Sequence, residues 1–184
     1  MHRRILPVLL VVVATAIAAD AGAATCDAAI RRVERRYGLP EGLLLAVGRT
    51  EAALSTGTAD PIVWSLTINA EGMPMRFGSA RLAAQAVRRL QEEGVRSIDT
   101  GCLQVNLKHH PQAFERVEDA FDPDINADYG GRYLLRLYRE SGAWDAAVGR
   151  YHAGRARPEA ARRYACAVYR NLARLRAQRP NPCR

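Results

Sequence analysis

The sequence contains no apolar stretch that is long enough to span a membrane as a helix. The longest runs from Ile5 to Ala19, which is 15 residues, whereas a spanning helix needs roughly 20. Two arginines precede this run, and small residues of the kind that a signal peptidase recognises follow it as far as Ala24. We therefore expect residues 1–24 to be a secretory signal peptide, with no stable membrane span once it is removed.

Lysine is almost absent, because Lys108 is the only one among the 27 lysine and arginine residues. The formal net charge is +8, and removal of residues 1–24 takes away two arginines and one aspartate, which leaves +7. An exported basic protein meets the anionic polymers of the cell envelope rather than nucleic acid. No helix pair with base-reading residues stands out either. We expect an envelope polymer as the partner and no nucleic acid.

The sequence also lacks histidines and cysteines at the spacing that is typical of a metal site. His109 and His110 lack acidic or thiol companions at suitable distances along the chain, and the cysteine spacing does not suggest zinc. We predict no metal and no other cofactor. Four cysteines in an exported chain allow three disulfide pairings, between which the sequence does not choose. Because chain termini often lie close together, the expected bridge joins Cys26 to a C-terminal cysteine. The other three cysteines are Cys102, Cys166 and Cys183.

The rest of the chain, which has no internal repeat, predicts one mainly α-helical domain with a small inserted β-hairpin. The domain is expected over residues 25–178, with the hairpin insert at about 61–78 and a short tail at 179–184. Glycines, Ser79 and the Asp122-Pro123 pair mark the helix ends. The expected elements are helices at 27–37, 40–51, 80–93, 123–140, 144–151 and 158–176, a loop at 52–61, a hairpin at 64–77, a short apolar element at 102–107 and a helix-like stretch at 114–121.

Glu51 is the first candidate for chemistry. It stands at the end of an otherwise apolar helix, where partial desolvation favours the protonated form of a carboxyl group. A general acid that works near neutral pH needs this property. The alternative is an ordinary solvated glutamate at a helix end.

Two further motifs carry polar side chains in apolar surroundings. Gln104 and Asn106 lie in the segment Gly-Cys-Leu-Gln-Val-Asn, and buried amides need hydrogen-bond partners. They either bond to neighbouring backbone or bind the N-acetyl and hydroxyl groups of an amino sugar. Tyr151 opens the segment Tyr-His-Ala-Gly, which is either a helix end with a capping glycine or a site where the tyrosine orients a carboxylate.

These residues resemble the goose-type-lysozyme-like catalytic domain of soluble lytic transglycosylases, the SLT domain. Residues 39–52 are similar to its helix that ends in Glu-Ser, residues 101–106 to its Gly-Leu-Met-Gln-Ile-Asn, and residues 151–154 to its Tyr-Asn-Ala-Gly. Asn126 fits the asparagine that precedes its long helix. The resemblance covers about residues 28–170, with the motifs in the family's order.

The resemblance implies a function in peptidoglycan cleavage, located in the periplasm. Glu51 would be the single acid/base, cleaving the β-1,4 bond between N-acetylmuramic acid and N-acetylglucosamine to leave a 1,6-anhydromuramoyl end. This differs from the paired carboxylates of most glycoside hydrolases. Gln104 and Asn106 would bind sugar, Tyr151 would hydrogen-bond Glu51, and Asn126 would support the site, so that all four are expected to be substrate-binding residues.

Several positions depart from the family pattern. Ala52 stands where a serine is common, so one hydrogen bond near the reacting sugar is either missing, which would lower activity, or supplied by Ser55 or Thr50. Cys102 and His152 replace more usual residues. The 53 residues that separate Glu51 from Gln104 exceed the family spacing because of the hairpin. Some exported family members with such a hairpin serve secretion or flagellar assembly, so the insert is expected to shape the groove, meet such an apparatus, or act as a lid.

Two rival functions remain open. One is a hydrolytic lysozyme, or muramidase, in which Asp60 or Asp99 positions a water molecule opposite Glu51. The other is a non-catalytic peptidoglycan-binding module for assembly, for which Ala52 would be the sign of lost activity.

Overall fold

The computed structural model describes residues 25–55, 57 and 61–177, and its architecture is mainly helical, as the sequence predicts. The predicted signal peptide and the C-terminal tail lie outside the described residues. In the described part of the chain no helix is both long and apolar enough to cross a membrane. The helices are α1 (Cys26–Tyr37), α2 (Leu43–Glu51), α3 (Ala80–Glu92), η1 (Val117–Phe121, a 3-10 helix), α4 (Pro123–Ser141), α5 (Trp144–Ala153) and α6 (Pro158–Leu175).

The helix ends lie where the capping residues predict them. The Ser79 side chain accepts a hydrogen bond from the Leu82 amide at the start of α3, and Asp122 accepts from two amides at the start of α4, with Pro123 at the first helical position. Gly38 ends α1 in the left-handed conformation (φ 62°). The stretch at 114–121 is helical only at η1, which is shorter than expected.

Helix α2 begins later than the sequence predicts, because Pro40 lies in the preceding turn rather than in the helix. Its N-cap, Gly42, has no side chain to accept the first amide protons. Glu34 of α1 supplies this function from a distance: its carboxylate accepts from the Gly42 and Leu45 amides at 3.0 Å each. Glu34 is only 4% exposed, so this buried carboxylate joins the two helices.

The predicted hairpin is present, but it is part of a larger sheet. Strands β3 (Thr67–Ala70) and β4 (Met73–Arg76) pair antiparallel around Glu71 and Gly72. Strands β5 (Ile98–Thr100) and β6 (Val105–Asn106) extend them to a four-stranded sheet of order β4-β3-β5-β6. The segment expected to be a loop also contains β1 (Ala53–Leu54), which pairs with β2 (Ile62–Val63). Strands of two or three residues are too short to show alternation in the sequence.

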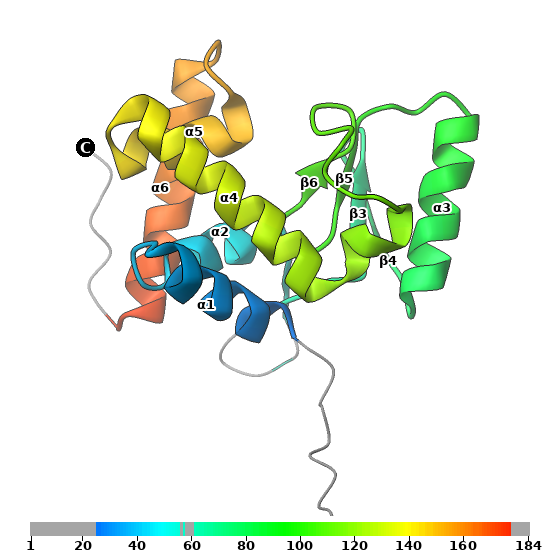
Figure 1. Cartoon of the computed structure of the whole chain (residues 1–184), viewed down its shortest axis with the longest axis horizontal. Helices are drawn as coiled ribbons and strands as arrows, with labels where there is room; N and C mark the ends of the chain where they lie inside the picture. The colour runs from blue at the N-terminus through cyan, green and yellow to red at the C-terminus, as the bar shows by residue number, and fades with distance from the viewer. Residues whose placement is uncertain (1–24, 56, 58–60, 178–184) are drawn as a thin grey trace, which may run out of the picture.

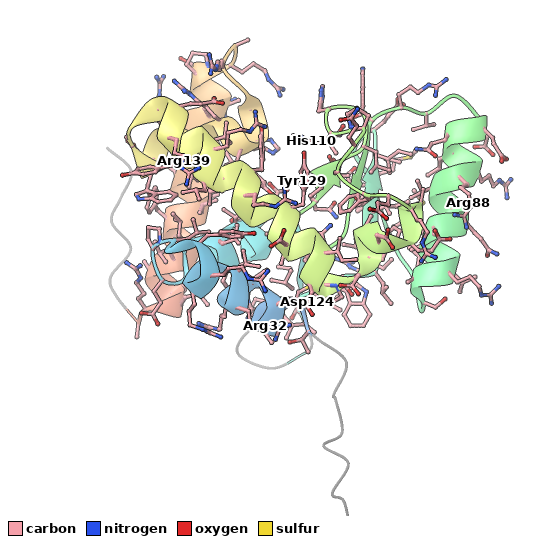
Figure 2. All side chains as sticks on the ribbon, viewed as in Figure 1. Arg32, Arg88, His110, Asp124, Tyr129 and Arg139 are labelled. Carbon is pink, nitrogen blue, oxygen red and sulfur yellow. A yellow bond between two sulfur atoms is a disulfide. The ribbon has the colours of Figure 1, made fainter. Side chains whose placement is uncertain are left out.

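Two cores fill the molecule, one on each side of the cleft described below. Helices α1, α2, α4, α5 and α6 pack around the larger core, whereas α3 and η1 pack with the sheet around the smaller one. Figure 1 shows the helical group on one side and the sheet with α3 on the other, with α4 running between them. Ion pairs hold α1 against α4, and Figure 2 shows Arg32 and Asp124 pointing toward each other across this contact.

A disulfide joins the beginning of the helical core to the turn between β5 and β6. It links Cys26 to Cys102, whose Cα atoms lie 5.7 Å apart. The expectation that Cys26 pairs with a C-terminal cysteine is therefore wrong, because packing of α1 beside the turn brings Cys102 to it instead. Cys166 is disulfide-bonded as well, and Cys183 lies outside the described residues.

Candidate active site

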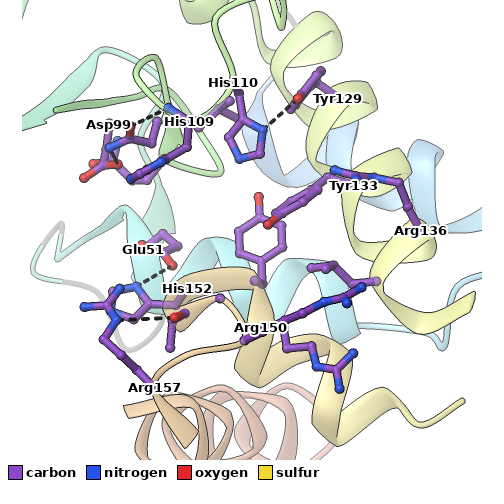
Figure 3. A pocket seen from close by; sticks show the side chains of 18 of the residues that line it. Glu51, Asp99, His109, His110, Tyr129, Tyr133, Arg136, Arg150, His152 and Arg157 are labelled. Carbon is purple, nitrogen blue, oxygen red and sulfur yellow. Dashed lines mark hydrogen bonds and ion pairs between the residues drawn. The ribbon is translucent and has the colours of Figure 1, made fainter. Parts of the chain in front are cut away.

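Glu51 lies at the C-terminal end of α2, where the buried helix delivers its carboxylate to a cleft of about 720 Å³. Its side chain is 15% exposed, so it is desolvated but accessible. The Tyr164 hydroxyl of α6 donates a hydrogen bond to Glu51 Oε1 at 2.5 Å. The His152 Nδ1 atom lies 3.8 Å from the same oxygen, as Figure 3 shows. Both of these contacts, which come from residues that the structure describes, fall on a single oxygen atom of the carboxylate.

The tyrosine that contacts Glu51 is Tyr164, and the prediction that Tyr151 would do so is wrong. The Tyr151 hydroxyl donates instead to the Leu103 carbonyl oxygen at 3.1 Å. Burial, followed by the nearby Glu51 carboxylate, raises the pKa of both phenols well above 10.0. Both therefore stay protonated and act as hydrogen-bond donors. Tyr151 lines the same cleft and fixes the backbone next to Gln104.

Gln104 lines the cleft on a tight turn between β5 and β6. Its own φ is 45°, and Gly101 at the start of the turn has φ 75°. A Cβ atom at Gly101 would lie 2.2 Å from the Ala120 carbonyl oxygen, so only glycine fits there. The Gln104 amide donates to the Gly101 carbonyl at 3.0 Å, which leaves its carbonyl oxygen available to a ligand.

Asn126 supports this turn from behind and does not contact the cleft. It is fully buried (0% exposed), and its Oδ1 atom accepts from the Leu103 amide at 2.9 Å. Its Nδ2 atom donates to the carbonyls of Thr100 and Ala120. The expectation that Asn126 binds substrate is therefore wrong, because burial removes it from reach, and its role is to hold the turn that carries Gln104.

Asn106 and Asp99 face the cleft from the sheet. The Asn106 Nδ2 atom donates to Asp99 Oδ1 at 2.8 Å and to Ser97 Oγ at 3.0 Å. Burial raises the pKa of Asp99, the hydrogen bond from Asn106 lowers it, and Glu51 adds a smaller increase. The predicted cleft residue Asn106 is thus already engaged, and Asp99 is the carboxylate that lines the cleft from the sheet, whereas Glu51 lines it from α2. Asp60, the other aspartate considered for hydrolysis, lies outside the described residues.

The remaining cleft wall is aromatic and basic. His110 contacts the Tyr129 hydroxyl at 2.9 Å and meets the Tyr133 ring edge-on at 4.6 Å. Asn69 of β3 also lines the cleft, so the inserted hairpin forms part of its wall. Four arginines border the same cavity, and Figure 3 labels three of them. The four are Arg136, Arg150, Arg155 and Arg157.

Comparison with known families matches residues 28–171 to the Transglycosylase SLT domain. The chain belongs to this family. No curated protein and no solved structure was found to match it significantly. Members of the SLT domain family are lytic transglycosylases, which are lyases acting on peptidoglycan, so the predicted enzyme class is confirmed. The lysozyme-like fold expected from the resemblance is confirmed with it.

Four of the five predicted site residues line the cleft. Glu51, Gln104 and Asn106 line it, Tyr151 lines it in a different role, and Asn126 lies behind it. Sequence reasoning missed Tyr164, which reads as one more apolar position on the inner face of α6. It lies 113 residues from Glu51 in the chain, and only the packing of α6 on α2 brings the two together.

Neither Thr50 nor Ser55, the two expected substitutes, takes the place of the serine that the family commonly has at position 52. Ala52 is buried. The Thr50 hydroxyl donates to the Ala46 carbonyl at 2.8 Å and accepts from Asn171 at 3.0 Å, so it is engaged inside the helical core. Neither Thr50 nor Ser55 is among the residues that line the cleft.

Proposed function

We propose that this lytic transglycosylase cleaves the β-1,4 bond between N-acetylmuramic acid and N-acetylglucosamine without water, with Glu51 as its single acid/base. The observation that carries the proposal is the environment of Glu51. Its carboxyl group is mostly buried at the cleft, and Tyr164 holds one of its oxygens. The other oxygen is thereby left to exchange a proton with substrate.

The proposed reaction has two proton transfers through the same group. Glu51 first donates its proton to the glycosidic oxygen as the bond from that oxygen to C1 of the muramoyl sugar breaks. The 6-hydroxyl oxygen of the same sugar then bonds to C1, and its proton passes to Glu51. The products are a 1,6-anhydromuramoyl end and a free 4-hydroxyl on N-acetylglucosamine, and Glu51 regains its proton.

The cleft supports binding of a sugar polymer. Gln104 presents an amide oxygen, the tyrosine rings offer apolar faces, and the arginines favour an anionic strand.

The test is the identity of the products released from insoluble peptidoglycan sacculi, measured by mass spectrometry. Wild-type protein should release anhydromuramoyl fragments, and Glu51→Gln should release them at least about 1000-fold more slowly, because the amide cannot exchange a proton. Reducing muramoyl ends would show hydrolysis instead, with Asp99 as the group that positions water. Equal release by the two proteins would remove Glu51 from the mechanism.

We further propose that the enzyme acts in the periplasm, where its substrate lies. The predicted signal peptide and the presence of disulfides support this location. Opening of the wall for a secretion or flagellar apparatus rests on the resemblance to hairpin-bearing family members, with the hairpin as the surface that would meet it. Cell fractionation with sequencing of the mature N-terminus tests the location, and loss of secretion or motility in a Glu51→Gln strain tests the role.

A further inference from the structure

His152 is the one cleft histidine, among those the structure describes, that contacts Glu51. It occupies the last turn of α5, and its Nδ1 atom lies 3.8 Å from Glu51 Oε1. The side chain is 53% exposed, so protons from solvent reach it freely. Nothing in the two proton transfers proposed above uses it.

Stacking fixes the direction in which the imidazole points. The His152 and Tyr164 rings lie parallel, with an interplanar angle of 4° and centroids 4.6 Å apart. The Tyr164 hydroxyl donates to the same Glu51 oxygen that His152 approaches. The imidazole, the phenol and the carboxylate therefore form one unit, in which both partners act on Oε1 and leave Oε2 to the substrate.

The charges around His152 favour its protonated form. The hydrogen-bonding contact with Glu51 raises the pKa of His152 above 6.5, and burial opposes this in part. Arg157 lowers it, whereas the more distant Asp99 of β5 raises it further. The Tyr164 hydroxyl, which faces Glu51 from α6, stays neutral. The imidazolium thus persists to a pH above the ordinary value for histidine and is lost as the pH rises further.

We propose that His152 is a positioning residue of the transglycosylase reaction, whose imidazolium holds Glu51 as a carboxylate between its two proton transfers. This inference rests on the proposed function of Glu51. After Glu51 gives its proton to the glycosidic oxygen, its new negative charge lies against the imidazolium. The carboxylate is thereby kept in place as the base that receives the proton of the 6-hydroxyl. No proton leaves His152 in the cycle.

The first experiment measures the coupling without catalysis, by NMR titration of the histidine ring signals in the full-length mature protein. In wild type the His152 signal should titrate above pH 6.5, and in Glu51→Gln its midpoint should fall by at least about half a unit, because the carboxylate is gone. The His110 signal serves as the internal control and should keep its midpoint, because burial, Arg136 and His109 lower the pKa of His110 and Glu51 is not among the causes. An unchanged His152 midpoint in Glu51→Gln would overturn the proposal, whether or not the protein cleaves peptidoglycan.

The second experiment measures catalysis in His152→Asn, which keeps a hydrogen-bond donor but cannot carry charge. We expect kcat to fall about tenfold with little change in KM. In wild type kcat should decrease as the pH rises through the imidazole ionisation, and this decrease should be absent from His152→Asn. His109→Asn, which changes the other exposed cleft histidine, should keep the wild-type pH dependence. A decrease that survives in His152→Asn would assign it to another group and reject the proposal.

Failure of the proposed function looks different from failure of this inference. If Glu51 is not the acid/base, Glu51→Gln keeps its activity while the NMR coupling is intact. If His152 only packs on Tyr164, Glu51→Gln loses activity while the His152 titration and the pH dependence of His152→Asn match those of wild type.

Discussion

At the scale of single residues, the site depends on one oxygen atom. Glu51 Oε1 receives the Tyr164 hydroxyl and faces His152. Glu51 itself was predictable, because the resemblance to the SLT domain favoured a functional carboxyl at the end of the apolar helix over an ordinary solvated glutamate. Its partners were not, since Tyr164 belongs to the apolar stripe of α6 and the resemblance pointed to Tyr151. When a tyrosine on the apolar face of a helix donates its hydroxyl to a carboxylate far away in the chain, the neighbouring sequence gives no sign of that contact.

Removal of the Tyr164 hydroxyl should therefore lower activity while the fold persists. For Tyr164→Phe we expect kcat/KM to fall about 10- to 100-fold, because a buried hydrogen bond to a charged group is worth roughly 1.5–3 kcal/mol. Turbidity loss of a sacculus suspension gives the rate. Tyr169→Phe on the same helix is the matched control and should retain wild-type activity. Equal rates for the two variants would show that the phenol does not orient Glu51.

At the scale of elements, local signals predicted the helices well and the strands poorly. Caps such as Ser79 and Asp122 act within three residues, so they can be recognised in the sequence. The cap of α2 is different, because it comes from Glu34 on the preceding helix. Strand β5 has only three residues, and its pairing with β3 depends on contacts across about 30 positions. Local sequence patterns do not predict contacts between segments that lie so far apart in the chain.

The α2 cap gives a test of stability that is independent of catalysis. Glu34→Ala should lower the free energy of unfolding by about 2–3 kcal/mol, because two helix amides lose their acceptor in a buried site. Urea unfolding followed by circular dichroism measures the change. Glu41→Ala, at an exposed position seven residues further on, should stay within about 0.5 kcal/mol of wild type. A Glu34→Ala protein as stable as Glu41→Ala would mean that water replaces the cap.

At the scale of the whole molecule, one covalent bond spans the junction of the helical core and the cleft. The Cys26–Cys102 disulfide closes a loop of 76 positions and anchors the turn that carries Gln104. The sequence predicted that disulfides form but not this pairing. The reason is physical, since the pairing depends on how α1 packs against a turn far along the chain.

Loss of this bond should destabilise the protein and loosen the site. For Cys26→Ala combined with Cys102→Ala we expect the free energy of unfolding to drop by about 4 kcal/mol, the value for closing a loop of this length. Chemical unfolding measures the loss in the free energy of unfolding. The loss in Glu34→Ala, which changes only the cap of α2, serves as the reference. A stability equal to that of wild type would show that the packing of α1 alone holds the turn.

The cleft separates two cores, and each core carries a different set of the residues that line the cleft. Glu51 and its partners belong to helices of the larger core, whereas Asn69, Asp99 and Asn106 project from the sheet of the smaller one. We therefore expect substitutions within the sheet core to alter which glycan strand the cleft accepts, and the proton chemistry to depend on the helices. Substrate selectivity and catalytic rate can thus change independently during evolution. A library of variants confined to the core residues under β3 and α3 should include proteins with new glycan preferences and a nearly unchanged kcat.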